Sequence, residues 1–498
     1  MSEPTDDIDA LAKGGRTNVA GFLLRLLARL PFLFIAGRIY GADLVGRFAI
    51  AVVVVELAAL IATLGLRRGL AQALATTDRP HSHVVWDAMA VAFVASMIAS
   101  AVLFAFPQLL YPNTEVTGLD RFLPLIIVAT AWSDISLAAL AYRHNVRAAV
   151  TARAVVEPWT ISIAAWAFSF VALRDGLVLS YVASMIAALI ASVVPFVRAY
   201  GLPRGWSPHL RPLFALARAN AALAGADAVE WGTRNVDRLL LGLLFEPGIV
   251  GIYYMAQQVA SLPAKLKTSF DPILGPVVTE ALARGDKAAV ARQVAQVAFW
   301  IMAAQGGLAL MGSIPGEAVM GVVGPAFVAG TAALAFLLTA EFAASAGAVS
   351  ESALVYIART RNLMISVAML GVQVVLSLVL VFAMRAAGWP TAWQAAGPAV
   401  ALMVSLAVTS VIKVRFLERL LGASVSPWRW TLLWAALAAI AVGTVFTALP
   451  QRYEWAELVI GVPLIAAAYL GVLWHWGFGE ADRAVFRRKP RVAAVLTT

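Results

Sequence analysis

Two arginines near the beginning of the chain could attract an anion inside a membrane. Arg25 and Arg29 are four residues apart in an apolar run, so a helix places them on one face. Arg29 lies near the middle of that run, where a guanidinium is costly unless it faces a cavity or a partner. Arg25 and Arg38 could instead reach the membrane interface with their long side chains. We therefore expect Arg29 to face a water-filled cavity, where it can attract an anionic group.

A second charged stretch, from Gly225 to Gln257, is an apolar segment long enough to span a membrane. Its charged residues are Asp227, Glu230, Arg234, Asp237 and Arg238. Glu230, Arg234 and Arg238 follow one another at i,i+4 spacing, so they could form a salt-bridge ladder along one helix. Alternatively, they face the same cavity as Arg29 and exchange partners as two halves of the protein move.

Single acidic residues occur in other apolar runs: Glu56, Asp134, Glu157, Asp271 and Glu341. Each could be a counter-ion for a buried arginine. Each could also carry a proton or another cation, because ionisable groups inside a membrane are commonly functional. Together with Glu230 and Asp237, these acids are the candidates for coupling to H⁺ or Na⁺. The residue types leave both interpretations open.

The two charged stretches are weak copies of each other. One shift aligns Gly46 with Gly251, Val45 with Val250, Phe48 with Tyr253, Ala51 with Ala256 and Arg29 with Arg234. Repeats with charge in the middle of the membrane are typical of transporters, whose binding sites lie between the repeats. We therefore interpret the chain as the two halves of a transporter. Gly46 and Gly251 should each lie just past the outer end of a first helix, and superposing the halves should place Arg29 near Arg234.

The composition excludes an ordinary soluble domain. Of the 498 residues, 61% are hydrophobic and 13% are charged, and the mean hydropathy is +0.83. A soluble domain has roughly a quarter of its residues charged. The chain has no cysteine, and its five histidines form no H-x-x-x-H pair. The sequence also has no phosphate-binding loop, no nucleophile elbow, and no D-x-D in a loop that could hold a metal–nucleotide sugar. We therefore expect no enzyme, no metal site and no cofactor.

Apolar runs long enough to cross about 30 Å of hydrocarbon predict an all-α polytopic membrane protein with about fourteen transmembrane helices. In the first half they cover 19–40, 47–66, 86–107, 122–142, 154–173 and 178–197. In the second half they cover 220–245, 249–270, 293–312, 327–350, 363–384, 396–414, 430–449 and 457–475. The first run has no A-x-A cleavage site, so we expect an uncleaved helix.

Lysine and arginine residues in the loops orient these helices. With the N-terminus in the cytoplasm, most of them fall in cytoplasmic loops, among them Arg143, Arg153, Arg284 and Lys413. The opposite loops hold only Arg121, Arg174, Arg385 and Arg452. This asymmetry predicts that both termini are cytoplasmic. It also accounts for most of the formal net charge of +10, so no nucleic-acid partner is needed.

The predicted helices divide the chain into four parts. They are an N-terminal lobe (1–197), a cytoplasmic connector (198–215), a C-terminal lobe (216–416) and a last pair of helices with a basic tail (417–498). The connector is rich in proline and glycine, as expected for an irregular segment.

Several segments resemble polysaccharide-transporter flippases. The stretch from Asp237 to Ala256 (DRLLLGLLFEPGIVGIYYMA) resembles the motif that opens their second half. The segments 14–17 (GGRT) and 40–48 (YGADLVGRF) resemble their N-terminal region, and Leu262-Pro263 and 276–287 also fit. Over almost its whole length the chain is similar to Wzx-type lipid-linked oligosaccharide flippases of the MATE/lipid II flippase (MOP) superfamily.

This resemblance implies two six-helix lobes in a V around a central cavity, followed by two C-terminal helices. It implies alternating access in the bacterial inner membrane. The substrate would be an O-antigen or exopolysaccharide repeat unit linked to undecaprenyl diphosphate, carried head-first from the inner to the outer leaflet. A monomer is expected, with the lipid bilayer, a polymerase and other polysaccharide assembly proteins as partners.

A diphosphate needs cations inside the cavity, and arginine binds phosphate through paired donors. The candidates for this role, in order, are Arg29, Arg25 and Arg234, followed by Arg38 and Arg238. A cation-coupled exporter of drugs or of lipid II is an alternative with the same architecture. A membrane polysaccharide polymerase or ligase fits less well, because such enzymes carry a large catalytic loop outside the membrane.

The predicted topology can be tested by cysteine labelling, because the chain contains no cysteine of its own. A Lys287→Cys variant should resist a membrane-impermeant reagent added from the periplasm, since the loop around Arg284 is expected to be cytoplasmic. Labelling of this variant from the periplasm would refute the fourteen-helix topology.

Overall fold

The computed structural model describes residues 29–112, 116, 118–264, 280–281, 284–449 and 454–483. These residues form helices and short connections, and no strand occurs among them. The predicted all-α fold is therefore confirmed. Arg25 and Asp271, which the sequence analysis singled out, lie outside the described residues.

The helices of the first part of the chain follow the predicted apolar runs. Residues 29–35 are helical and continue directly into η1. In chain order, the elements of this part are η1 (Ala36–Tyr40), α2 (Gly41–Ala62), α3 (Leu66–Ala75), α4 (His81–Ala105), η2 (Pro107–Leu109), η3 (Gly118–Leu125), α5 (Ile126–Tyr142), α6 (Val146–Val150), η4 (Thr151–Val156), α7 (Glu157–Phe168) and α8 (Gly176–Tyr200). The helix that includes α6, η4 and α7 begins earlier than the predicted run 154–173.

The second part begins with two helices that carry the charged stretch, α9 (Leu210–Leu244) and α10 (Pro247–Ala264). The helices that follow are α12 (Lys287–Ser313), α13 (Gly316–Val323), η6 (Pro325–Gly330), α14 (Thr331–Ile357), α15 (Arg359–Ala386), α16 (Thr391–Leu421), α17 (Trp430–Thr447), α18 (Glu454–Ala456), η8 (Glu457–Gly461), α19 (Val462–Val472), η9 (Leu473–Gly477) and α20 (Glu480–Arg483). Among the described residues, ten helical runs are long and apolar enough to cross a membrane. The full count of fourteen stays a prediction.

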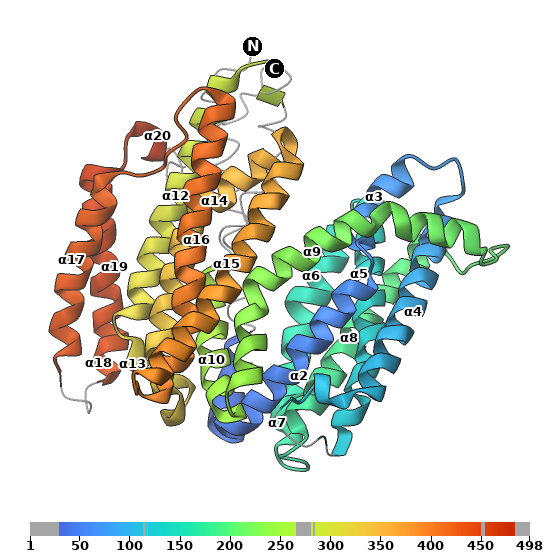
Figure 1. The fold of residues 1–498 in the computed structure, drawn as a ribbon, viewed down its shortest axis with the longest axis horizontal. Helices are drawn as coiled ribbons and strands as arrows, with labels where there is room; N and C mark the ends of the chain where they lie inside the picture. The colour runs from blue at the N-terminus through green and yellow to red at the C-terminus, as the bar shows by residue number, and fades with distance from the viewer. Residues whose placement is uncertain are drawn as a thin grey trace, which may run out of the picture.

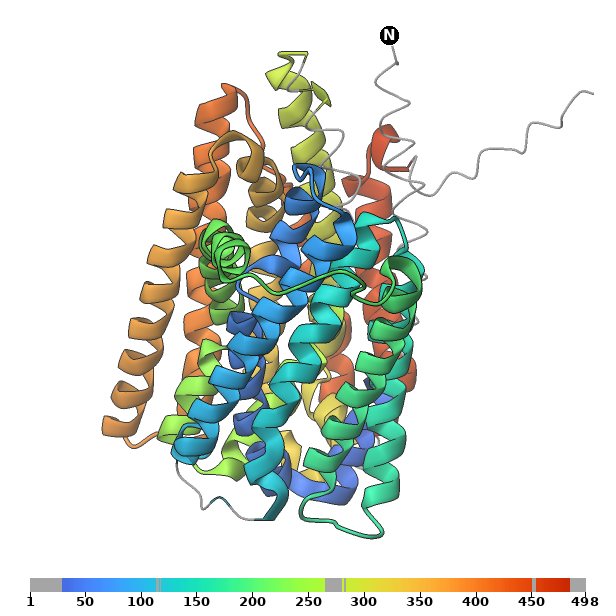
Figure 2. The same cartoon turned by 90° about the vertical axis from the view of Figure 1, so that its right-hand side faces the viewer.

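The helices gather into two groups (Figure 1). The helices α2 to α8 pack together, with α4 against α5 and α7 against α8. In the other group α14 contacts α12, α15 and α16, and α17 packs on α19. The helix α9 is bent: its first part runs across the direction of α4 and α8, and its second part turns to run beside α10 (Figures 1 and 2). The helix α10 packs along α2, so the chain's first and second halves meet there.

Two glycines form the contact between α2 and α10. A Cβ atom on Gly46 would lie 1.6 Å from the backbone oxygen of Pro247, and one on Gly251 would lie 2.0 Å from that of Ala42. Each glycine thus faces the residue four positions before the other glycine, as expected if the two helices are equivalent copies. Small residues at a helix crossing in a membrane let two backbones touch. The two glycines that one sequence shift aligns therefore lie against each other's helix at this crossing.

The contact predicts that neither glycine tolerates a methyl group. We expect Gly46→Ala to lower the stability of the detergent-solubilised protein by about 1 to 3 kcal/mol, because overpacking forces the two backbones apart. Thermal unfolding measures this change. Gly371→Ala in α15 is a matched control, since a Cβ atom there meets nothing within 4 Å. Equal melting of the two variants would contradict a tight crossing.

Candidate functional site

An ion pair joins α2 to α9 close to Tyr254 of α10. Arg238 is 6% exposed, and its Nη2 lies 3.9 Å from Oε2 of Glu56. The guanidinium carbon lies 5.4 Å from the centre of the Tyr254 ring, and Nη2 also donates to the side chain of Asn235. The buried Nε atom of Arg238 has no hydrogen-bond partner among the described residues. Arg238 is therefore a buried cation with unused donor capacity.

Arg29 belongs to the same cluster. The charges that act on the Glu56 carboxylate come from Arg238, Glu157, Arg29 and Arg153. The Arg29 side chain is exposed, and it also acts electrostatically on Tyr254. The side chain of Glu56 is 39% exposed. The charge of Arg29 therefore acts on the Glu56–Arg238 pair, although the three residues are far apart in the sequence.

Arg153 holds two of the predicted acids. Its Nη1 donates to Oε2 of Glu157 at 2.7 Å, and its Nη2 donates to Oδ1 of Asp134. The sequence analysis assigned Arg153 to a cytoplasmic loop, which is wrong, because the helix already begins at Val146 and includes Arg153 in η4. The i,i+4 spacing of Arg153 and Glu157 was the available signal. Asp134 and Glu157 are thus counter-ions of a third arginine.

Asp237 has partners of its own. It is fully buried, and its Oδ2 accepts hydrogen bonds from the Tyr253 hydroxyl at 2.5 Å and from Nε2 of Gln257 at 3.2 Å. Its Oδ1 accepts a bond from the backbone N–H of Arg238. Asp237 therefore ties α9 to α10 and is fully satisfied within this half of the chain.

The acidic residues Asp227 and Glu230 of α9 pair with an arginine on another helix instead of forming a salt-bridge ladder along α9. Glu230 pairs with Arg68 of α3, and Oδ1 of Asp227 lies 2.7 Å from Nε of the same arginine. Arg234 is exposed and acts electrostatically on Glu230. The sequence gives no sign that Arg68 is this partner, because it lies 162 residues away from Glu230.

Two other predicted residues, Arg38 and Glu341, lie outside this cluster. Arg38 donates to the backbone oxygens of Gly321 at 2.8 Å and Val322 at 3.2 Å, so it binds the last turn of α13. Glu341 lies half-buried on α14. Arg38 therefore does not join the Arg29–Arg238 cluster.

A buried lysine on α16 was also missed. Lys413 is 3% exposed, and its Nζ lies 2.9 Å from Oε2 of Glu351 and 3.0 Å from Oγ of Ser366. The sequence analysis placed Lys413 in a cytoplasmic loop, which is wrong, because α16 continues to Leu421. The apolar run ended near Val414, so hydropathy alone gave no sign that the helix continues.

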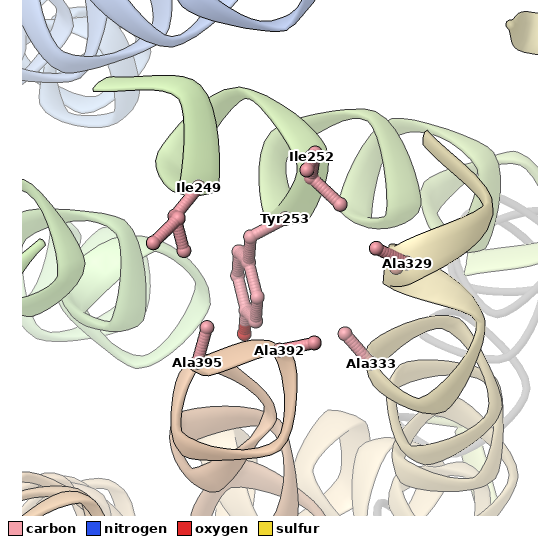
Figure 3. Close-up of a pocket in the computed structure, with 8 residues that line it drawn as sticks. Ile249, Ile252, Tyr253, Ala329, Ala333, Ala392 and Ala395 are labelled. Carbon is pink, nitrogen blue, oxygen red and sulfur yellow. The ribbon is translucent and has the colours of Figure 1, made fainter. Parts of the chain in front are cut away.

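A small cavity lies beside α10 (Figure 3). It has a volume of about 160 Å³ and is lined by Ile249, Ile252, Tyr253, Ala329, Gly330, Ala333, Ala392 and Ala395. This lining is apolar and carries no charge, so it lacks the cations that a diphosphate needs. The part of the chain that the structure describes also contains no group of three or more His, Cys, Asp or Glu that could hold a metal ion.

The arginine–acid cluster can exchange ion pairs. Arg153 pairs with Asp134 and Glu157, Arg238 pairs with Glu56, and the charges of Arg29 and Arg153 also act on Glu56. Several of these side chains are partly exposed. An anion that enters this region can compete with Glu56 for Arg238 and Arg29. The cluster therefore has the chemistry of an anion-binding site with internal counter-ions.

Comparisons with known proteins agree with this architecture. The sequence profile of a family described as polysaccharide biosynthesis protein matches residues 37–312. No curated protein matches the chain in sequence. A structure of the lipid II flippase MurJ in an inward closed conformation has a TM-score of 0.66 and 12% identity, covering 92% of this chain and 97% of that one.

Two other solved structures have the same fold. An inward-facing multidrug resistance MATE family transporter of the MOP superfamily has a TM-score of 0.55 and 12% identity, covering 85% of this chain and 95% of that one. A MOP superfamily transporter from Pyrococcus furiosus, whose binding pocket is described as having reverse polarity, has a TM-score of 0.51 and 12% identity, covering 84% and 96%. With its profile match extending over more than half of its length, the chain belongs to the polysaccharide biosynthesis protein family and has the fold of MOP superfamily transporters.

Proposed function

We propose that the protein is a flippase that moves an undecaprenyl-diphosphate-linked oligosaccharide from the inner to the outer leaflet of the bacterial inner membrane. The observation that carries this proposal is the cluster of Arg29 and Arg238 around Glu56, beside the contact between the two halves. Membership in a polysaccharide biosynthesis family supports a saccharide cargo. The flippase and exporter folds of the similar structures support movement across a membrane.

The diphosphate is the part of the cargo that the cluster would bind. Arg29 and Arg238 would provide the guanidinium donors, and Arg234 lies one helical turn before Arg238 on α9. Glu56 lies 3.9 Å from Arg238, which is longer than a hydrogen bond, so the two groups attract each other by charge without a direct hydrogen bond. A diphosphate would displace Glu56 from both arginines while the lipid tail remains in the bilayer.

Ion coupling follows from the same competition. A carboxylate that loses its cation in apolar surroundings becomes costly as an anion, and it lowers this cost by taking up a proton. Glu56 is the foremost candidate, because Asp134 and Glu157 share the close cation Arg153. Asp237, Glu230, Asp271 and Glu341 remain candidates of lower rank. The proposed cycle therefore couples substrate binding to uptake of H⁺ by Glu56, with Na⁺ as the alternative ion.

A second candidate function is export of lipid II. The observation that favours it is the TM-score of 0.66 with the lipid II flippase MurJ. Deletion of the gene followed by analysis of lipid-linked glycans separates the two. Accumulation of an undecaprenyl-diphosphate oligosaccharide on the inner leaflet supports the first function, and accumulation of lipid II supports the second.

Substitution of Arg29 tests the proposed diphosphate-binding role directly. We expect Arg29→Ala to reduce export by roughly 30-fold or more, because truncating one partner of a charge pair costs about 2 to 5 kcal/mol. Arg29→Lys should keep part of the activity, since it retains the charge but loses the paired donors. Export and membrane abundance are measured together for both variants. Normal export by Arg29→Ala, or failure only because the protein disappears, would remove the diphosphate-binding role.

Substitution of Arg153 should reduce folded protein, unlike substitution of Arg29, because the ion pairs of Arg153 with Asp134 and Glu157 are structural. Arg153→Gln leaves Asp134 and Glu157 without their cation, and breaking a buried ion pair costs about 3 to 5 kcal/mol. We expect a loss of folded protein, measured by abundance and melting in detergent. Adding Asp134→Asn and Glu157→Gln to this variant should restore much of the fold. If Arg153→Gln folds normally but fails to export, Arg153 belongs to the substrate site instead.

A further inference from the structure

The connector between the two halves and the start of α9 form a surface with two kinds of exposed side chain. The apolar residues Leu202, Leu210 and Phe214 are 61%, 85% and 69% exposed. The arginines Arg204, Arg211 and Arg218 are exposed beside them. No acidic residue occurs between Gly201 and Ala226. This surface, called the basic connector below, is therefore both apolar and uniformly cationic.

The basic connector is held in place by the rest of the protein. The indole N–H of Trp206 donates to Oδ1 of Asp87 on α4 at 2.8 Å, and the Trp206 ring lies against Trp86. On the inner face of α9, Leu213 and Leu216 pack against the hydrophobic core. Phe214 and Arg218 are four residues apart on the opposite face, where they remain exposed. The exposed face is thus fixed in direction and is not needed for the fold.

The length and the bend of α9 indicate that this face lies at the membrane surface. The helix has 35 residues and would be about 52 Å long if straight, which exceeds the roughly 30 Å hydrocarbon core. It bends instead, and its first part lies across the spanning helices on the side of the bundle (Figures 1 and 2). A helix that lies in the plane of the membrane with an apolar face and arginines is typical of an interfacial anchor.

We propose that the basic connector binds the anionic phospholipid headgroups of the cytoplasmic leaflet. Leu210 and Phe214 enter the boundary between headgroups and acyl chains, and Arg204, Arg211 and Arg218 contact the phosphates. The charge of the surface selects this occupant, because the arginines have no acid within the segment to neutralise them. Since α9 also carries Arg234 and Arg238, this anchor fixes one end of the helix that bears the central cations.

Spin labels on the cysteine-free chain test where this face lies. Phe214→Cys and Leu210→Cys are labelled separately in nanodiscs of phosphatidylcholine, with or without about 30% phosphatidylglycerol. We expect both labels to be more accessible to oxygen than to a water-soluble nickel complex, with greater depth when phosphatidylglycerol is present. A label at Lys287→Cys, which is exposed, is the aqueous control. Labels at 210 and 214 that behave like the control would overturn the proposal, and would leave the surface free for a cytoplasmic protein.

The preference of the protein for anionic lipid tests whether the three arginines contact phosphate headgroups. Native mass spectrometry of the protein from mixed lipids should show phosphatidylglycerol bound in preference to phosphatidylcholine, by about fivefold for each arginine that contacts the surface. The triple variant Arg204→Gln, Arg211→Gln, Arg218→Gln should lose most of this preference. Its matched control is Arg359→Gln, Arg361→Gln, Arg415→Gln, which removes the same charge from exposed positions at the ends of other helices. An equal loss in both triples, or no preference in the parent protein, would refute the proposal. The label measurements need no arginine variant, so they decide the matter even if a triple variant does not fold.

Discussion

The ion pair between Glu56 and Arg238 places a buried cation of the second half of the chain against an acid of the first half. A guanidinium that is 6% exposed is costly in apolar surroundings unless an acid and other polar groups lie near it. Its partner is on α2, while Arg238 is on α9 and the Tyr254 ring is on α10. These three elements must therefore remain close whenever Arg238 has no other anion. A distance of 3.9 Å leaves room for a better ligand to take the place of Glu56.

Glycines make this proximity possible. At one end of α2, Gly46 and Gly251 let the backbones of α2 and α10 touch. Near the other end, a Cβ atom on Gly69 would lie 1.6 Å from Oδ1 of Asn220, so α3 lies directly on α9. Arg68, the neighbour of Gly69, then reaches Asp227 and Glu230. Close backbone contacts and ion pairs thus both occur where α2 and α3 pack against α9 and α10. Charged side chains can meet across helices only where the backbones are already near.

The sequence predicted the helices better than it predicted their partners. Hydropathy located each apolar run, because a membrane helix needs a continuous apolar segment. The shift that aligned Gly46 with Gly251 found two residues that do touch. The same reasoning misplaced Arg153 and Lys413, because each lies at the boundary of a predicted apolar run whereas the helix extends beyond that boundary. Charge patterns along one helix suggested a ladder on α9, whereas Glu230 pairs with Arg68, 162 residues away in sequence. Pairing at such separation depends on the fold and leaves no local pattern.

The balance of charge around Glu56 links substrate to ion under the proposed function. The cations Arg29, Arg153 and Arg238 and the acids Glu56, Asp134 and Glu157 act on one another, so this group carries equal numbers of cations and acids. A diphosphate adds negative charge to a region that is already neutral, and apolar surroundings make that excess costly. The excess can be removed only if an acid takes up a proton or moves into water. Asp237 is unsuited to this role because Tyr253, Gln257 and a backbone N–H already satisfy it. Glu56 is suited, because it is partly exposed and loses its cations to the substrate. Binding of the anion and uptake of the proton by Glu56 would then occur together, at the place where the two halves of the chain meet.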